Sequence, residues 1–185
     1  MIEDTILEAI DKMEKAVEHV QSQFTTVRTG RAAPALVERL MVEYYGAPVP
    51  LQQLAGFQVP EARQLVVKPH DRGALNAIEK AIRDSDLGVN PSNDGVIIRL
   101  ALPALTEERR REIVKVVRQQ AETGRVAVRT ARREALADLK ELLKEKLVTE
   151  DEERRGQEDI QKLTDRFVAQ VDALLKDKEA EIMAF

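Results

Sequence analysis

Hydrophobic residues recur at spacings of three and four along three long stretches of this chain, residues 2–28, 106–146 and 150–183. This spacing places apolar side chains on one face of an α-helix. Three helices with one apolar stripe each can bury those stripes against one another in a bundle. The stripes comprise Ile2, Ile6, Ile10, Met13, Val17, Val20, Phe24 and Val27; then Ile113, Val117, Gly124, Val128, Ala131, Ala135, Leu139 and Leu142; then Ile160, Leu163, Phe167, Val171 and Leu174.

Two of the helix boundaries are marked by local signals. Thr149 is followed three residues later by Glu152, the spacing of a capping box, and this predicts the start of the third helix. The first helix is expected to stop near Thr29 and Gly30, because a glycine and then Pro34 follow its last apolar positions.

Residues 40–100 show a different pattern, with shorter segments and more β-branched residues. Strands are predicted at 40–45, 65–68 and 96–100, and a helix at 71–83 with Asp71 as its N-cap. The segment Gly46-Ala47-Pro48 and the prolines Pro60 and Pro69 are interpreted as breaks between elements. The chain is therefore predicted to have an α+β fold, in which a small β/α/β domain, residues 31–104, is inserted into a three-helix bundle of residues 1–30 and 105–185.

Two short crossings, each with a proline, connect the predicted domains. Short connections leave little room for a shared core, so a bent arrangement with relative motion of the two domains is expected. The predicted hinge consists of Thr29, Gly30, Arg31, Ala32 and Pro34 on one crossing and Leu102, Pro103, Ala104 and Leu105 on the other.

The middle helix also carries arginines along one edge. Arg111, Arg118, Arg125, Arg129 and Arg132 cluster on the helical wheel beside the apolar stripe, with Lys115 and Arg133 flanking them. Between Thr106 and Arg133 there are nine basic and four acidic residues, and after Val126 no acid occurs before Glu134. Pairing within the helix is therefore not expected to neutralise this edge. A solvated face would explain the charges, but the arginine fork also favours a phosphate-bearing partner such as a nucleic acid.

The overall composition limits the other possibilities. Aromatic residues make up only 3% of the 185 residues and tryptophan is absent, so the core must be aliphatic. The net charge is −4, and residues 145–185 carry twelve acids against seven bases, so nucleic-acid binding would have to use one local face. Without cysteines, a membrane-length apolar run or a basic leader, a location in the cytoplasm is expected, with no membrane partner.

No catalytic site, metal site or cofactor is predicted. His19 and His70 stand alone, and the cluster Glu150–Glu153 is explained as favourable charge at a helix N-terminus. Gly30 and Gly46 are isolated and do not form a phosphate-binding loop.

Several long motifs, in order along nearly the whole chain, resemble the bacterial ribosome recycling factor family. One departure is His70, where an aromatic or aliphatic residue would be expected. The motifs are Arg28-Thr29-Gly30-Arg31-Ala32-Ala33-Pro34, Val42-Glu43-Tyr44-Tyr45-Gly46-Ala47-Pro48, Asp86-Leu87-Gly88-Val89-Asn90-Pro91, the segment Leu102–Arg110, Arg125-Val126-Ala127-Val128-Arg129 and the segment Asp159–Asp165.

This resemblance implies an L-shaped protein of roughly transfer-RNA dimensions, which acts with elongation factor G and GTP on the ribosome left after termination. It implies a monomer, without enzymatic activity of its own, in the inter-subunit space. The ribosomal RNA contacts carried over from it are Arg28 and Arg31 near the hinge and Arg129, Arg132 and Arg133 on the long helix, and Arg125 joins them as part of the same edge.

Two alternatives belong to other functional classes. A helical adaptor could use the arginines to bind acidic side chains of a protein partner, and co-sedimentation with ribosomal subunits distinguishes this case. An enzyme is disfavoured by the lack of a catalytic arrangement.

Overall fold

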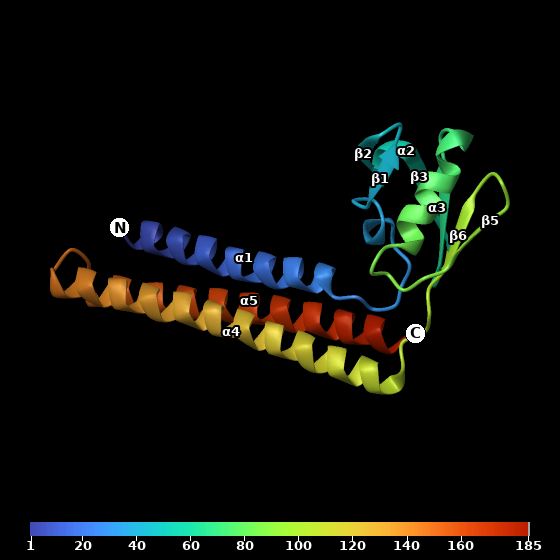
Figure 1. The fold of residues 1–185 in the computed structure, drawn as a ribbon. Helices are drawn as coiled ribbons and strands as arrows, with labels where there is room; N and C mark the ends of the chain where they lie inside the picture. Colours follow the sequence, from blue (N-terminus) through green and yellow to red (C-terminus); the bar gives the residue numbers. More distant parts are fainter. Residues whose placement is uncertain (185) are drawn as a thin grey trace. The chain divides into compact units, whose positions relative to one another are not determined.

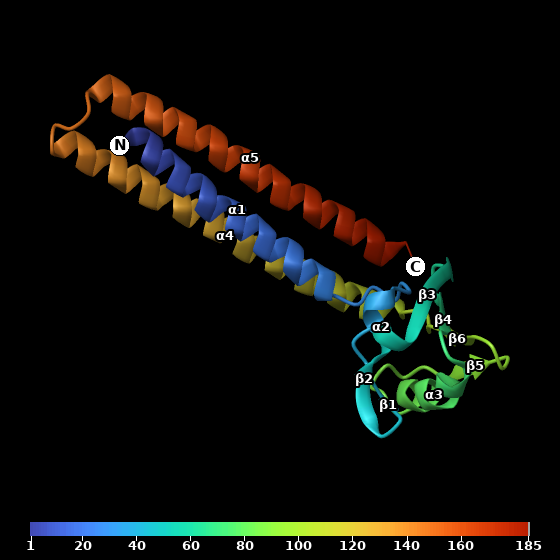
Figure 2. The same cartoon turned by 90° about the horizontal axis from the view of Figure 1, so that it is seen from above.

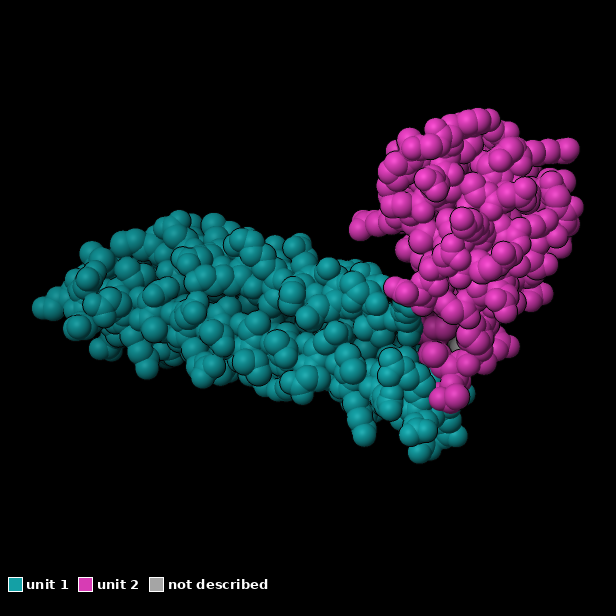
Figure 3. Space-filling view, in the orientation of Figure 1, with its two compact units in different colours: residues 1–28, 107–184 teal, residues 29–106, 185 magenta. Residues whose placement is uncertain are grey.

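The computed structural model describes residues 1–184, which form two compact units (Figure 3). Unit 1 consists of Met1–Arg28 and Glu107–Ala184, and unit 2 of Thr29–Thr106. The fold is α+β, as predicted: the long helices belong to unit 1, and unit 2 combines short strands with short helices.

Unit 1 is a bundle of α1 (Ile2–Thr26), α4 (Glu107–Lys144) and α5 (Glu150–Met183), which lie side by side in Figures 1 and 2. All three helices were predicted, with ends within about two residues of those observed, the variation normal for helix termini. α4 runs antiparallel to α1, since Lys12 lies beside Glu134 whereas Val20, later on α1, lies beside Gly124, earlier on α4. The capping box at the start of α5 is confirmed: Thr149 Oγ1 accepts from the Glu152 N–H and a Glu152 oxygen accepts from the Thr149 N–H.

The bundle core is formed by the predicted stripes together with alanines that the periodicity did not single out. Ala9, Ala16 and Ala121 are buried beside the larger predicted residues. Several predicted stripe residues are only partly buried: Ile2, Ile6, Ile10, Val17, Val27, Leu142, Leu163 and Leu174. One layer of the core contains Met13, Ala16, Val128, Ala131 and Phe167, and another contains Ala9, Ala135, Leu139 and Ile160.

At Gly124, α1 approaches α4 closely. A Cβ atom on Gly124 would stand 2.2 Å from Val20 Cγ2 and 3.9 Å from Val171 Cγ1. The absence of a side chain therefore lets all three helices meet at this level.

Unit 2 contains a hairpin and a four-stranded antiparallel sheet. The hairpin pairs β1 (Met41–Tyr44) with β2 (Ala47–Pro50) through Tyr45 and Gly46. Both turn residues have positive φ, 50° and 78°, as a two-residue type I′ turn requires. The sheet order is β3 (Ala55–Glu61), β4 (Gln64–Pro69), β6 (Ile98–Ala101) and β5 (Pro91–Asn93).

Three helical segments complete unit 2. These are the one-turn helices η1 (Pro34–Leu36) and α2 (Leu51–Leu54), and η2 (Arg72–Ala74) leading into α3 (Leu75–Arg83). The predicted helix at 71–83 is thus found, and the Asp71 side chain caps η2 by accepting from the Gly73 N–H at 2.9 Å.

The strand predictions for unit 2 need correction. The chain from Ala47 to Pro50 was interpreted as a break and is strand β2, and β3 and β5 were missed. Prolines are accepted in these strands because β2, β3 and β5 each pair on one side only. β6 starts at Ile98, not at Val96, since Asp94 Oδ1 accepts from the N–H groups of Val96 and Ile97 and holds them in a turn.

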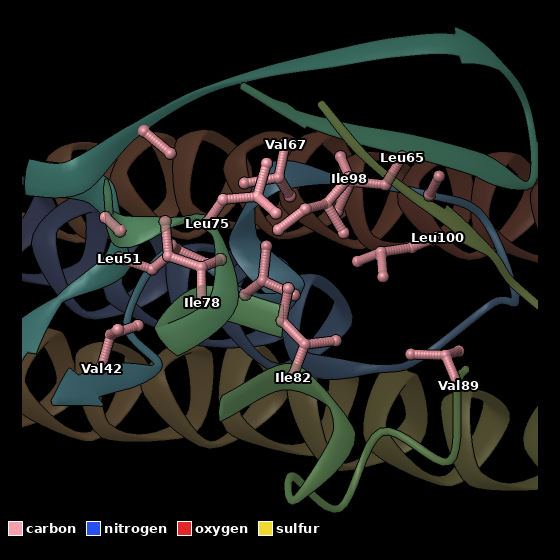
Figure 4. Close-up of a cluster of buried hydrophobic side chains, with 14 residues drawn as sticks. Val42, Leu51, Leu65, Val67, Leu75, Ile78, Ile82, Val89, Ile98 and Leu100 are labelled. Carbon is pink, nitrogen blue, oxygen red and sulfur yellow. The ribbon is translucent and has the colours of Figure 1, made fainter. Parts of the chain in front are cut away.

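The core of unit 2 is aliphatic, as the composition predicted. Side chains from the hairpin, the sheet and α3 converge in it (Figure 4), including Val42, Leu51, Leu65, Ile78 and Ile98, each with an exposed fraction of 0%. Each unit has its own core.

Candidate nucleic-acid interface

Four of the six arginines predicted to contact RNA lie on α4. They are Arg125, Arg129, Arg132 and Arg133, within about two turns of one another. The structure divides the predicted edge into arginines that contact α5 and arginines that face solvent.

Arg118 and Arg125 form interhelical ion pairs with α5. Arg118 Nε lies 2.5 Å from Glu179 Oε1, and Arg125 Nε lies 2.7 Å from Asp172 Oδ1. The two arginines are seven residues apart, and so are the two acids, so the pairs recur every two turns of antiparallel helices. We call Arg118, Arg125 and Arg132, with their α5 partners Glu179, Asp172 and Gln161, the α4–α5 ladder.

Arg125 is more enclosed than Arg118, with a side-chain exposed fraction of 19% against 63%. Burial lowers the pKa of its guanidinium, but the hydrogen bonds to Asp172 and Glu122 outweigh that effect and raise it. Any contact of Arg125 with a phosphate would have to replace Asp172, so its first role is to join α4 to α5.

Arg132 occupies the next ladder position without a carboxylate partner. Its Nη1 donates to Gln161 Oε1 at 3.2 Å, and Gln161 Nε2 in turn donates to Asp165 at 2.9 Å. Its Nε is buried and makes no hydrogen bond to any of the described residues. Arg132 is therefore positioned by α5 while keeping its positive charge uncompensated by a direct ion pair.

Arg129 and Arg133 are both exposed and are not members of the ladder. Arg133 Nη2 donates to Thr130 Oγ1 at 3.3 Å, and within residues 1–184 neither Arg132 nor Arg133 has a carboxylate at ion-pair distance. The expectation that Arg129 has no acidic neighbour is wrong: Arg129 Nη1 lies 3.6 Å from Glu122 Oε1, nearly two turns earlier on α4. The Arg129 side chain is 47% exposed, so its ion pair with Glu122 is open to solvent and weak.

The two remaining predicted RNA contacts belong to different units. Arg28 is exposed just beyond the end of α1, in unit 1, and Arg31 is exposed in unit 2. Arg28 has no carboxylate at ion-pair distance among the residues the structure describes.

The predicted hinge residues form two irregular segments held at one end by unit 2. The Ala32 N–H donates to the Ala62 carbonyl at 2.7 Å, and the Leu102 N–H donates to the Arg63 carbonyl at 2.8 Å. Both segments are thereby attached to the turn between β3 and β4. The remaining hinge residues are Thr29 and Gly30 before Ala32, Pro34 in η1, and Pro103, Ala104 and Leu105 after Leu102.

Gly30 has the backbone conformation that favours glycine. Its φ is +79°, and a Cβ placed on it would stand 3.2 Å from Leu105 Cγ, so the two segments are in close contact here. Thr29 beside it is buried, with an exposed fraction of 6%.

Residues 1–184 do not form a metal site of the usual kind. They contain no group of three or more His, Asp or Glu side chains placed to hold a metal ion. Over the same residues, no helix is long and apolar enough to cross a membrane. His19 and His70 are both exposed.

Comparison with known proteins decides the family. Residues 20–183 match the family described as ribosome recycling factor. The chain belongs to the ribosome recycling factor family. Relatives named ribosome-recycling factor include one from Carboxydothermus hydrogenoformans, 55% identical with full coverage of both chains, and one from Acidothermus cellulolyticus, 54% identical over 99% of each.

Two solved structures of ribosome recycling factors are also similar. The first is a solution structure of a ribosome recycling factor, with 46% identity, a TM-score of 0.75 and coverage of 100% of this chain and 98% of that one. The second is described as models for the T. thermophilus ribosome recycling factor and the E. coli elongation factor G bound to the E. coli post-termination complex. It is 52% identical, with a TM-score of 0.64 over 98% of both chains.

The acids that pair with the arginine edge were not predicted. These acids are Asp172 and Glu179, and with Asp165, which accepts from Gln161, they recur every seven residues on α5, at the same interval as Arg118, Arg125 and Arg132 on α4. Matching seven-residue repeats of opposite charge on two helices of one bundle indicate interhelical pairing. That signal was present in the sequence but becomes readable only once the antiparallel direction of the two helices is known.

Proposed function

We propose that this protein recycles ribosomes: with elongation factor G and GTP, it separates the post-termination ribosome into subunits and releases mRNA and tRNA. Membership of the ribosome recycling factor family carries this proposal. Support also comes from the similar T. thermophilus factor, which is described on a post-termination complex with elongation factor G. The protein acts in the cytoplasm as a monomer, and elongation factor G supplies the GTP hydrolysis.

The proposed contact with large-subunit ribosomal RNA uses the α4 edge around Arg129, Arg132 and Arg133. Three arginines within little more than one helical turn can meet successive phosphates, and two of them have no direct carboxylate partner in residues 1–184. The α4–α5 ladder holds the backbone of this edge in place, because α4 cannot rotate without breaking the pairs of Arg118 and Arg125. Arg28 and Arg31 extend the proposed contact, and Arg125 joins it only if Asp172 is displaced.

The proposed hinge consists of the two crossings between the units. Hydrogen bonds to the β3–β4 turn hold Ala32 and Leu102 on unit 2, so the pivot is assigned to residues 29–31 and 103–105. Binding to RNA alone cannot split a ribosome. A rigid bundle fixed on RNA and a second unit that can be pushed by elongation factor G would convert that push into separation of the subunits.

Light scattering tests the proposed function directly. Post-termination ribosomes are mixed with this protein, elongation factor G and GTP, and a fall in scattering reports separation into subunits. Splitting must require all three components. A protein that does not sediment with ribosomal subunits, or that leaves the scattering unchanged, would reject ribosome recycling in favour of an adaptor for another partner.

A further inference from the structure

A groove of about 530 Å³ lies between strand β1 and helix α3 of unit 2. Figure 2 shows the β1–β2 hairpin beside α3. On the helix side, Ala77, Ala81 and Asp84 follow one another at intervals of four and three residues, so they form one stripe of α3 and its C-cap. Because the two alanines are short, the groove stays open along this stripe. The lining residues are Leu40, Met41, Glu43, Ala77, Lys80, Ala81, Asp84 and Ser85.

The free edge of β1 borders this groove. β2 carries prolines opposite Met41 and Glu43, and a proline has no N–H to donate. The bonds between the two strands are therefore made at Val42 and Tyr44, and the alternation of an antiparallel ladder directs the N–H and C=O groups of Met41 and Glu43 away from β2. Within residues 1–184, no backbone group of another segment pairs with them. Both residues line the groove, so their backbone groups are available to a strand that enters it.

β1 differs from the other edge strands in the described part of the chain. β2 contains Pro48 and Pro50, β3 contains Pro60 and β5 contains Pro91, whereas β1, Met41–Tyr44, contains no proline. Proline on an edge strand discourages pairing with a further chain, because it removes a donor from the edge. Three edges are thus protected in this way, and the β1 edge keeps the groups that another strand needs.

The charge around the groove favours a basic partner. Glu43 and Asp84 are exposed acids, and Lys80 is the one base among the lining residues. Neither acid has a cation at ion-pair distance within residues 1–184, since the nearby Arg83 pairs with Glu79. The C-terminal end of α3 adds partial negative charge at the same place. A cationic segment is attracted to this surface, and the phosphates of a nucleic acid are repelled.

We infer that the groove between β1 and α3 binds an extended, positively charged segment of a partner protein, which adds a third strand to the β1–β2 hairpin. The backbone of the segment pairs with Met41 and Glu43, and its apolar side chains contact Ala77 and Ala81. A basic side chain meets Asp84 at the end of α3. Addition of a strand to an exposed edge is an established mode of peptide recognition, in which backbone bonds give affinity and pockets for alternate side chains give specificity. The groove belongs to unit 2 and does not depend on the RNA contact proposed for α4.

Selection from a display library of random linear peptides on the full-length protein tests the groove. Glu43→Pro removes a donor from the free edge without touching the bonds to β2, because Glu43 lies opposite Pro48. Glu43→Thr is the matched control, since it removes the same carboxylate and keeps the N–H in a residue suited to strands. Ala81→Leu fills the floor of the groove and leaves the β1 edge intact. Circular dichroism and urea unfolding verify that each variant is folded.

Peptides selected on the wild type should share apolar residues that alternate with lysine or arginine, and raising the salt concentration should weaken their binding. A selected peptide should bind Glu43→Pro about tenfold more weakly than Glu43→Thr, as expected for the loss of one or two backbone hydrogen bonds. Ala81→Leu should weaken binding as well. Hydrogen exchange of the Met41 and Glu43 amides in the wild type should slow when the peptide binds, and this measurement decides the contact even where Glu43→Pro unfolds.

Four results would overturn this groove as a site for a cationic protein segment. Equal binding of a selected peptide to Glu43→Pro and Glu43→Thr, with unchanged exchange of the two amides, would exclude strand addition. Enrichment of acidic peptides, or of none, would exclude the cationic segment. Displacement of a bound peptide by a short RNA duplex would assign the groove to nucleic acid. Sedimentation of the wild type as a dimer that Glu43→Pro converts to a monomer would assign the β1 edge to a second copy of this chain.

Discussion

Val20 occupies the space into which a side chain at Gly124 would project. The distance from Val20 Cγ2 to a Cβ built on Gly124 is 2.2 Å, far less than two carbon atoms tolerate. The Gly124 position thus sets how closely α1 can approach α4, and with it the spacing of the bundle that carries the arginine edge.

Gly124→Ala should destabilise the protein. Overpacking of a core contact costs about 1–3 kcal/mol, which exceeds the gain of up to about 1 kcal/mol from placing alanine in a helix. Urea unfolding measures the change. Adding Val20→Ala to Gly124→Ala should recover part of the loss, so that a double-mutant cycle shows coupling between the two positions.

Gly156→Ala is the matched control for that experiment. The nearest atom to a Cβ at Gly156 is Leu139 Cδ1 at 3.0 Å, the end of a flexible side chain that can move aside. The free energy of unfolding of the Gly156→Ala variant should differ from that of the wild type by less than about 1 kcal/mol. If Gly124→Ala were as stable as the wild type, the close approach of α1 and α4 would be wrong.

The bond between Tyr44 and Asp71 should make the stability of unit 2 depend on pH at both extremes. Tyr44 Oη donates to Asp71 Oδ2 at 2.8 Å, and this hydrogen bond raises the pKa of Tyr44 to about 12. The Gly73 N–H first, and then Tyr44, lower the pKa of Asp71 below its ordinary value of 3.8.

The two groups make the stability depend on pH in opposite directions. The raised pKa of Tyr44 means that its contribution is complete below pH 10.0 and is lost as the pH rises towards 12. The lowered pKa of Asp71 means that its contribution is present above pH 3.8 and is lost as the pH falls through the folded-state value. Tyr44→Phe should therefore be less stable than the wild type between the acidic and the alkaline limit. Below the first and above the second, the difference in stability should become small.

A spectroscopic titration isolates the tyrosine. In a Tyr45→Phe background Tyr44 is the remaining one of two tyrosines, so phenolate absorbance reports it alone. The expected midpoint lies well above the ordinary value of 10, because the hydrogen bond to Asp71 is the largest cause of the raised pKa, and Asp71→Asn should shift it towards 10. A midpoint that does not respond to Asp71→Asn would contradict the hydrogen bond.

Arg132→Ala should weaken binding to large ribosomal subunits and reduce its salt dependence. Removing one arginine–phosphate interaction lowers the slope of log affinity against log salt by about 0.7–0.9. Helicity should stay unchanged, since Arg132 makes no ion pair within residues 1–184. An unaltered slope would reject the phosphate role.

Two variants serve as controls for Arg132→Ala. Arg154→Ala removes an exposed arginine of α5 that pairs with Asp151, and it should leave the slope as in the wild type. Arg125→Ala removes a member of the α4–α5 ladder, so its main effect should be on unfolding by urea, with little effect on the slope.

Gly30→Pro should leave initial docking on the ribosome largely intact but slow subunit splitting. Proline fixes φ near −65°, whereas Gly30 has φ +79°, so the substitution alters the backbone of one crossing. Binding is followed by sedimentation and splitting by light scattering. Gly88→Pro is the control, because Gly88 also has positive φ, +66°, but lies outside the crossings. Equal splitting rates for Gly30→Pro and the wild type would count against the hinge.

The three long helices, their apolar stripes and the Thr149 cap could all be predicted from the sequence, because each depends on residues within a few turns of one another. The motifs shared with the family could be read in the same way. The strands β2, β3 and β5 could not, since Pro48 and Pro60 have the local signature of breaks and are accepted only where a strand has a free edge.

The roles of the individual arginines depended on the tertiary structure. The helical wheel placed Arg118, Arg125, Arg129 and Arg132 on one edge and treated them alike. The direction and spacing of α5 put Asp172 beside Arg125 and Glu179 beside Arg118, while Arg132 donates to the amide oxygen of Gln161. A charge pattern along one helix defines where cations can lie. The carboxylates that neutralise some of them come from another part of the chain. Only the packing of the helices therefore selects which cations remain for a partner.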